Sequence, residues 1–292
     1  MIWGSLLAWD LFLAGLGAGT FIVAALANIF RPDTTRAFQL GGRLIAPIAV
    51  TIGLCILIID AEAGLHNPTR FLYLLSNWGS IMTWGTAILS VFVVLAAVSA
   101  LLALLKRRIP KPLDYVGIVL AAGTATYTGV LLGVVGAYPL WNTALLPLLF
   151  VVSASRAGMA AISAVAVFSA KKEAEQLTSL KKTRFALPLV EAVLIALLLF
   201  FASQGNPAGL ASVVTLTSGS LALLFWGAYV VVGIALPFAL KLGGLLASKR
   251  SGERDKKEVG ALVLASCIGT LVGGFTLRYL ILMAAVPIAV VF

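Results

Sequence analysis

Residues that commonly bind metals are scarce in this sequence, which has one histidine and two cysteines among 292 residues. A single histidine cannot supply both axial ligands of a bis-histidine haem, and two cysteines cannot hold a four-cysteine iron–sulfur cluster. Cys55 and Cys267 lie inside apolar stretches, and their spacing suits neither a metal site nor a disulfide framework. We therefore expect no haem, no iron–sulfur cluster and no metal site in this chain.

Charged residues are also few, at 11% of the chain, whereas 61% of the residues are hydrophobic. Such a composition leaves too little polar surface to cover a soluble globular domain. A helix of about 20 apolar residues crosses the hydrocarbon core of a bilayer. Long apolar runs must form helices there, because lipid cannot satisfy a bare backbone. We predict an all-α integral membrane protein, a bundle of antiparallel helices that forms a single transmembrane domain over residues 1–292.

Eight apolar stretches are long enough to cross a membrane. We place the helices at residues 3–30, 43–65, 80–105, 114–136, 144–170, 185–203, 214–242 and 259–285. The first stretch lacks the basic flank of a signal peptide and is longer than the apolar core of one. We therefore expect it to be retained as the first transmembrane helix.

Basic residues are distributed unevenly among the loops between these helices. Of the 21 lysines and arginines, only Arg70, Arg156 and Arg278 lie away from four loop regions and their immediate edges. These regions cover residues 31–43, 106–113, 171–184 and 243–258. The asymmetry follows the positive-inside rule, and it accounts for the net charge of +10 without a nucleic-acid partner. We predict that the four basic loops are cytoplasmic and that both termini face outward.

Several ionisable residues lie inside the predicted spans or at their ends, where a charge is costly and usually faces a partner or a cavity. Arg156 is about 12 residues into the fifth helix, or roughly 18 Å from its outer end at 1.5 Å per residue. That depth is too great for its side chain to reach the interface easily. Other residues of this kind are Asp10, Asp60, Glu62, His66, Tyr127, Glu191 and Arg278.

These residues admit both a structural and a functional interpretation. Arg156 could form a buried ion pair with Asp10, Asp60 or Glu62 that only orders the bundle. Tyr127 could be a packed tyrosine, and Glu191, near the cytoplasmic start of the sixth helix, could be a protonated core residue or the inner end of a proton path. Taken together, an acid, a base and a phenol at similar depth suit a ligand with a polar head and an apolar tail. A quinone is such a ligand, and its reduction needs protons from titratable side chains.

Five stretches of the chain resemble the NrfD/polysulfide reductase family of membrane subunits. They are "WDLFLAGLGAGTF", "RLIAPIAVTIGLCILIIDAEAGLHNPTRFLYLL", "SIMTWGTAILSVF", "YTGVLLGVVGAYPLWNTALLPLLFVVSASRAGMAA" and "GGFTLRYLILMAA". Each stretch is a loose match by itself, whereas their order and spacing together are specific. The resemblance covers most of the chain and is weakest from about residue 171 to residue 215.

The resemblance implies a subunit that anchors a respiratory oxidoreductase, of molybdopterin type, in the bacterial or archaeal cytoplasmic (inner) membrane. The implied partners are a ferredoxin-like iron–sulfur subunit and a molybdopterin catalytic subunit on the outer face. The implied cofactor is menaquinone or ubiquinone, bound near that face. In characterised relatives, polar residues of the first helix and a tyrosine of the fourth contact the quinone, and the matching positions here are Asp10 and Tyr127. Relatives can use histidine or asparagine in the first helix, and this chain has neither near Asp10.

We therefore predict an electron-transfer subunit that oxidises quinol or reduces quinone and carries no redox metal of its own. Asp10, Tyr127 and Arg156 would form the quinone site, with Arg156 holding Asp10 or Asp60 ionised. The predicted proton-transfer residues are Asp60, Glu62, His66 and Glu191, and the predicted charge-pairing residue is Arg278. Two alternatives remain: a secondary transporter, in which the intramembrane charges form substrate and ion sites, and a purely structural membrane anchor.

Overall fold

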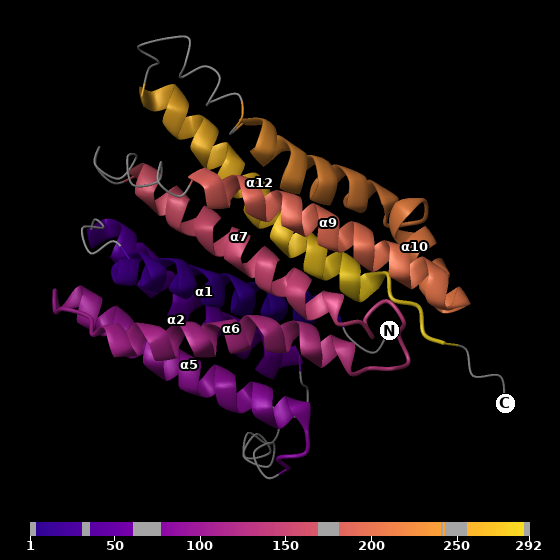
Figure 1. Cartoon of the computed structure of the whole chain (residues 1–292), viewed down its shortest axis with the longest axis horizontal. Helices are drawn as coiled ribbons and strands as arrows, with labels where there is room; N and C mark the ends of the chain where they lie inside the picture. Colours follow the sequence, from indigo (N-terminus) through magenta and orange to yellow (C-terminus); the bar gives the residue numbers. More distant parts are fainter. Residues whose placement is uncertain are drawn as a thin grey trace.

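The computed structural model describes residues 4–30, 36–60, 77–168, 181–240, 242 and 256–288, and within these ranges the chain forms helices and turns without a strand. The helices lie side by side along a common direction (Figure 1). Their bounds are α1 Ser5–Phe30, α2 Arg36–Asp60, α5 Ile81–Leu104, α6 Lys111–Gly133, α7 Leu145–Phe168, α9 Lys181–Gly205, α10 Pro207–Thr217, η1 Leu224–Ala235 and α12 Lys256–Met283.

Seven helices in the described part of the chain are long and apolar enough to cross a membrane: α1, α2, α5, α6, α7, α9 and α12. The all-helical membrane architecture expected from the composition is therefore confirmed. The unbroken helix predicted over residues 214–242 is wrong. The short helix α10 ends at Thr217, a turn follows, and a second apolar helix covers Leu224–Leu240. The small polar segment "SGS" at residues 218–220 breaks the run, because such residues favour turns over helix interiors.

The helix η1 has π-type hydrogen bonding over 12 residues. Segments of this kind are rare and often occur at functional sites. Inside η1, Tyr229 is fully buried and Gly233 packs against Gly273 of α12. A Cβ built on Gly233 would stand 2.6 Å from the Gly273 Cα, so the two backbones approach this closely only because both residues are glycines.

The bundle consists of two neighbouring groups of helices. The helices α1, α2, α5 and α6 form one group, and α7, α9, η1 and α12 form the other (Figure 1). The central helices α1 and α7 join the groups where Gly19 meets Gly158. A Cβ built on Gly19 would lie 3.3 Å from the Gly158 Cα, which explains why the crossing needs small residues.

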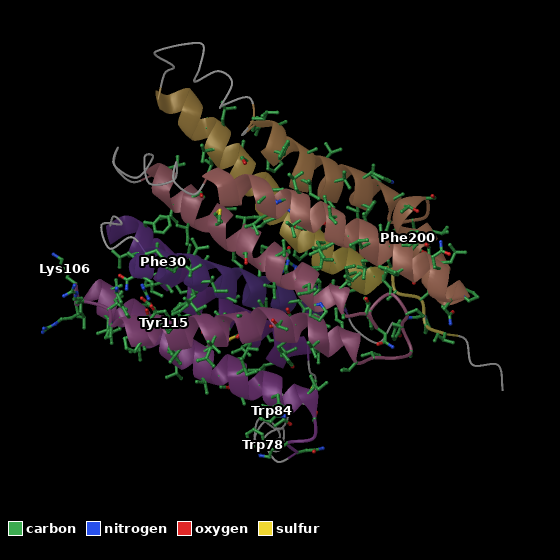
Figure 2. All side chains as sticks on the ribbon, in the orientation of Figure 1. Phe30, Trp78, Trp84, Lys106, Tyr115 and Phe200 are labelled. Atoms are coloured by element: carbon green, nitrogen blue, oxygen red, sulfur yellow. The ribbon has the colours of Figure 1, made fainter. Side chains whose placement is uncertain are left out.

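The buried apolar side chains form two main clusters, which overlap where α1, α6 and α7 meet. One cluster contains Phe21 and Phe92 in the first group, and another contains Phe150, Leu198 and Leu280 in the second. Many large apolar side chains, among them the labelled Phe200, instead point out from the sides of the bundle (Figure 2). A continuous apolar exterior of this kind fits a lipid environment rather than water.

Candidate functional site

Asp10 and Tyr127 lie in one region of the first group of helices. Asp10, on α1, is 7% exposed, and a Cβ built on Gly53 of α2 would stand 3.0 Å from its Oδ1. Tyr127, on α6, is half-buried with its ring against Gly85 of α5, in the space that a side chain at position 85 would occupy. The Asp10 carboxylate is close enough to interact electrostatically with the Tyr127 hydroxyl. The structure therefore brings together the two residues that the family resemblance singled out.

Three other predicted residues fall at the limit of what the structure describes. Asp60 is the last residue of α2, and its side chain lies outside the described residues. Glu62 and His66 also lie outside the described residues. Their predicted role in proton transfer therefore stays a prediction.

Arg156 forms the centre of a second polar cluster, in the other group of helices. It lies on α7 and is 7% exposed. Its Nη1 forms an ion pair with Glu191 Oε2 on α9, and its Nη2 donates a hydrogen bond of 2.8 Å to the carbonyl of Gly233 in η1. Arg156 thus pairs with Glu191, an acid that the sequence analysis did not name as its partner. Two of the acids that it did name, Asp60 and Glu62, have side chains outside the described residues. The sequence gives the depth of Arg156, which follows from its place along the helix. It does not give the helix that its side chain faces, because that depends on which helices pack on each side of α7.

Glu191 receives donors from two helices. Besides Arg156, the Tyr229 hydroxyl of η1 donates to Glu191 Oε1 at 3.3 Å, and both Glu191 and Tyr229 are almost fully buried. The sequence placed Glu191 near the cytoplasmic end of its helix. Because α9 begins at Lys181 instead of residue 185, Glu191 lies about one turn deeper, at the level of Arg156.

A small cavity adjoins this cluster on the side of α12. Its volume is about 20 Å³, which is enough for about one water molecule. Arg156, Ser266 and Thr270 supply its polar lining. The Ser266 hydroxyl is buried and has no hydrogen-bond partner among the described residues, so a water in the cavity would satisfy it.

Arg278 is fully buried on α12. Its Nε donates to the Leu11 carbonyl at 3.0 Å, and its Nη1 donates to Ser153 Oγ at 3.1 Å and to a carbonyl one turn earlier in α12 at 2.8 Å. The guanidinium also lies over the rings of Phe150 and Phe12, with Cζ 5.2 and 5.8 Å from their centroids. The charge pairing predicted for Arg278 is not seen, since Arg278 forms no salt bridge within the described residues.

A third buried cluster ties the first group of helices together. Arg43 was assigned to a basic loop, but α2 begins at Arg36 and places Arg43 inside the bundle with no exposed surface. Its Nη1 lies 2.8 Å from Asp114 Oδ1, and it also donates to Ser99. Asn28 Nδ2 donates to Asp114 Oδ2 at 2.6 Å. The Arg43–Asp114 ion pair and its two hydrogen bonds, to Ser99 and Asn28, thus join α1, α2, α5 and α6.

Sequence reasoning missed Arg43 and Tyr229, although each had a signal. Arg43 follows two glycines and precedes an apolar run, in "QLGGRLIAP", which is typical of a residue inside a tightly packed helix. Tyr229 is a single hydroxyl-bearing residue within "FWGAYVVVG". A buried tyrosine needs a hydrogen-bond partner, so its position alone suggested a nearby acceptor.

Comparison with known proteins assigns the family. A family profile described as "Polysulphide reductase, NrfD" matches residues 1–289. The chain belongs to the NrfD family. This NrfD-family chain is 30% identical over 308 residues to the C subunit of polysulfide reductase from Wolinella succinogenes, with 97% of the chain and 94% of that relative covered. It is 28% identical to protein NrfD from Escherichia coli, with 97% and 95% covered. The protein NrfD homolog from Haemophilus influenzae is 26% identical, with 97% and 94% covered.

The family membership confirms the resemblance drawn from the five sequence stretches. Together with the seven candidate spans, it identifies this NrfD-family chain as a multi-pass membrane protein.

Proposed function

We propose that this NrfD-family chain is the quinone-binding membrane anchor of a multi-subunit respiratory oxidoreductase. The observation that carries the proposal is the burial of the Asp10 carboxyl within electrostatic reach of the Tyr127 hydroxyl, in the first group of helices. A quinone carries two carbonyl oxygens that accept hydrogen bonds and a tail that suits the apolar space between helices. The Tyr127 hydroxyl can donate to such an oxygen, and the Asp10 carboxyl can exchange a proton with the site. This pair of side chains therefore fits the headgroup of menaquinone or ubiquinone.

The electrons would be exchanged with partner chains. With one histidine and two cysteines, this chain has few side chains able to hold a redox metal. The Wolinella succinogenes relative is named as the C subunit of polysulfide reductase, which favours an assembly of several subunits. In the proposal, a ferredoxin-like iron–sulfur subunit and a molybdopterin catalytic subunit bind the outer face. The complex lies in the bacterial or archaeal cytoplasmic membrane. In this proposal the shorter apolar helix Leu224–Leu240 adds an eighth crossing to the seven long helices, so that both termini of this chain face outward.

Proton transfer is divided between the two polar regions in this proposal. Asp60, Glu62 and His66 carry protons between the Asp10 region and the outer water. Glu191 belongs to the second region, where Tyr229 and the small cavity at Ser266 are its polar neighbours. Arg156 acts there by stabilising the Glu191 carboxylate, and it does not bind the Asp10 carboxylate.

The test is quinol oxidation by the purified native complex, measured as reduction of the partner's iron–sulfur cluster. We expect Tyr127→Phe to lower the rate about tenfold through loss of a hydrogen bond. We expect Asp10→Leu to lower it about 100-fold through loss of a proton-exchanging group. Both variants should assemble with their partners as the wild type does.

Tyr115→Phe is the matched control, because Tyr115 lies on the same helix but is 55% exposed on its outer surface. It should leave the rate unchanged. Wild-type rates in both Tyr127→Phe and Asp10→Leu would refute the quinone site and favour a purely structural anchor.

A further inference from the structure

An apolar groove runs along the outer surface of the bundle between α5 and α6. Its volume is about 440 Å³, and its lining consists of Ser90, Val91, Val94, Leu95, Val98 and Leu113. The stretch from Ser90 to Val98 is about 12 Å long at 1.5 Å per residue, which corresponds to a good part of an acyl chain. Val94, at its centre, is 65% exposed. The groove therefore opens sideways, toward the lipid.

A basic turn joins the same two helices. Lys106, Arg107, Arg108 and Lys111 lie within it or directly after it, and all four are exposed. Figure 2 shows Lys106 at the very end of the bundle, where its side chain extends away from the helices. None of the four forms a salt bridge within the described part of the chain.

The acid nearest to this turn in the sequence is already used inside the bundle. Asp114 has no exposed surface, and its two oxygens bind Arg43 and Asn28. Its negative charge therefore neutralises a buried arginine and is not available to the exposed cations. The turn keeps a concentrated positive charge that needs a partner from outside the chain.

The groove and the basic turn are continuous. Leu113 lines the groove and lies in the same first turn of α6 as Lys111. The antiparallel register is fixed by Gly117, where a Cβ would stand 2.9 Å from Leu95 Cδ2. Leu113 therefore lies closer than Leu95 to the end of α5 that carries the turn. Tyr115 is also exposed near this end, as is typical of a tyrosine at the level of lipid headgroups (Figure 2).

We propose that the α5–α6 hairpin binds an anionic phospholipid, with one acyl chain in the groove and the phosphate at Lys106, Arg107, Arg108 and Lys111. The uncompensated positive charge favours an anionic headgroup over a zwitterionic one. Each basic side chain near a membrane surface raises the affinity for an anionic lipid about fivefold. The site lies on the lipid-facing side of α5 and α6, and it does not depend on the proposed quinone site.

The experiment measures lipid binding to the full chain in detergent, by native mass spectrometry, during titration with phosphatidylglycerol or phosphatidylcholine. Arg107→Gln/Arg108→Gln removes headgroup contacts and should weaken phosphatidylglycerol binding about 25-fold. Val94→Phe fills the groove and should weaken it at least fivefold. Phosphatidylcholine should bind the wild type at least tenfold more weakly than phosphatidylglycerol. Should Val94→Phe fail to fold, Ser90→Leu fills the same groove with a smaller side chain.

Two control variants separate this site from general attraction to lipid. Lys181→Gln/Lys182→Gln removes two positive charges from another predicted cytoplasmic segment, and Val119→Phe adds the same bulk to an exposed position of α6 outside the groove lining. Both should bind phosphatidylglycerol as the wild type does. Equal weakening in the lysine control, unchanged binding in either test variant, or equal binding of the two lipids would overturn the proposal.

Discussion

Arg43, Arg156 and Arg278 are all buried, and different groups stabilise their positive charges. Arg43 and Arg156 each bind a carboxylate on another helix, whereas Arg278 relies on carbonyls, a serine and two aromatic rings. Breaking a buried ion pair by removing one partner leaves the other charge without compensation, which costs more than replacing both partners. The cost of replacing one of these arginines therefore depends on whether a buried carboxylate is left without its cation.

This difference predicts the behaviour of the Arg156–Glu191 pair. Arg156→Met should destabilise the bundle by about 3–5 kcal/mol, because the Glu191 carboxylate then stays buried without its cation. Arg156→Met/Glu191→Gln should recover most of that loss, since the glutamine is neutral and still accepts a hydrogen bond from Tyr229. Unfolding in detergent, analysed as a double-mutant cycle, measures the coupling. Additive losses would show that the two residues act independently.

The Tyr127 ring occupies its position because residue 85 is a glycine and has no side chain there. Gly85→Ala would place a methyl group inside the space of the Tyr127 ring, and the ring would have to move. We expect this variant to lose quinol oxidation about as severely as Tyr127→Phe, with a stability cost of about 1–3 kcal/mol from overpacking. Gly123→Ala is the control at the same helix pair, because its methyl would meet only the flexible Ile88, at 3.3 Å. In a Tyr127→Ala background, Gly85→Ala should have no further effect on the rate.

At the scale of elements, the second group of helices departs most from regular geometry. The α9–α10 junction, the turn after α10 and the π-helix η1 all occur within residues 205–235. The irregular backbone serves the polar cluster, because the Gly233 carbonyl of η1 accepts the hydrogen bond from Arg156. The regular helices of the first group contain no comparable break among their described residues.

The start of α10 depends on one cap. The Asn206 side chain accepts a hydrogen bond of 2.9 Å from the Ala208 N–H, while Pro207 occupies the first helical position. Asn206→Ala should destabilise α10 by about 1 kcal/mol. Amide hydrogen exchange should then become about fivefold faster in α10, and at other helices it should stay the same. Ser80→Ala is the control, because Ser80 precedes α5 without a side-chain cap bond. An equal effect of both substitutions would contradict the role of the cap.

At the scale of the whole molecule, the sequence predicted the membrane helices and the family, but not the polar contacts. Seven of the predicted spans overlap seven long apolar helices, because span length and hydropathy follow directly from composition. The partner of Arg156 could not be predicted, since several acids have suitable depths and only packing decides which helix faces α7. The break before η1 was missed because small polar residues are common inside transmembrane helices.

The orientation of the bundle can be tested at the two ends of α6. This helix has 23 residues and is therefore about 35 Å long, enough to cross the roughly 30 Å core of a bilayer. Arg107 lies in the basic turn before α6, and Asn142 lies in the turns after it, and both are exposed. In a background with Cys55 and Cys267 replaced by alanine, Asn142→Cys should react with a membrane-impermeant thiol reagent in intact cells. Arg107→Cys should react only after the membrane is permeabilised, because the positive-inside rule places its loop in the cytoplasm. Reaction of both cysteines in intact cells would contradict a crossing by α6, and the reversed pattern would show that the termini face the cytoplasm.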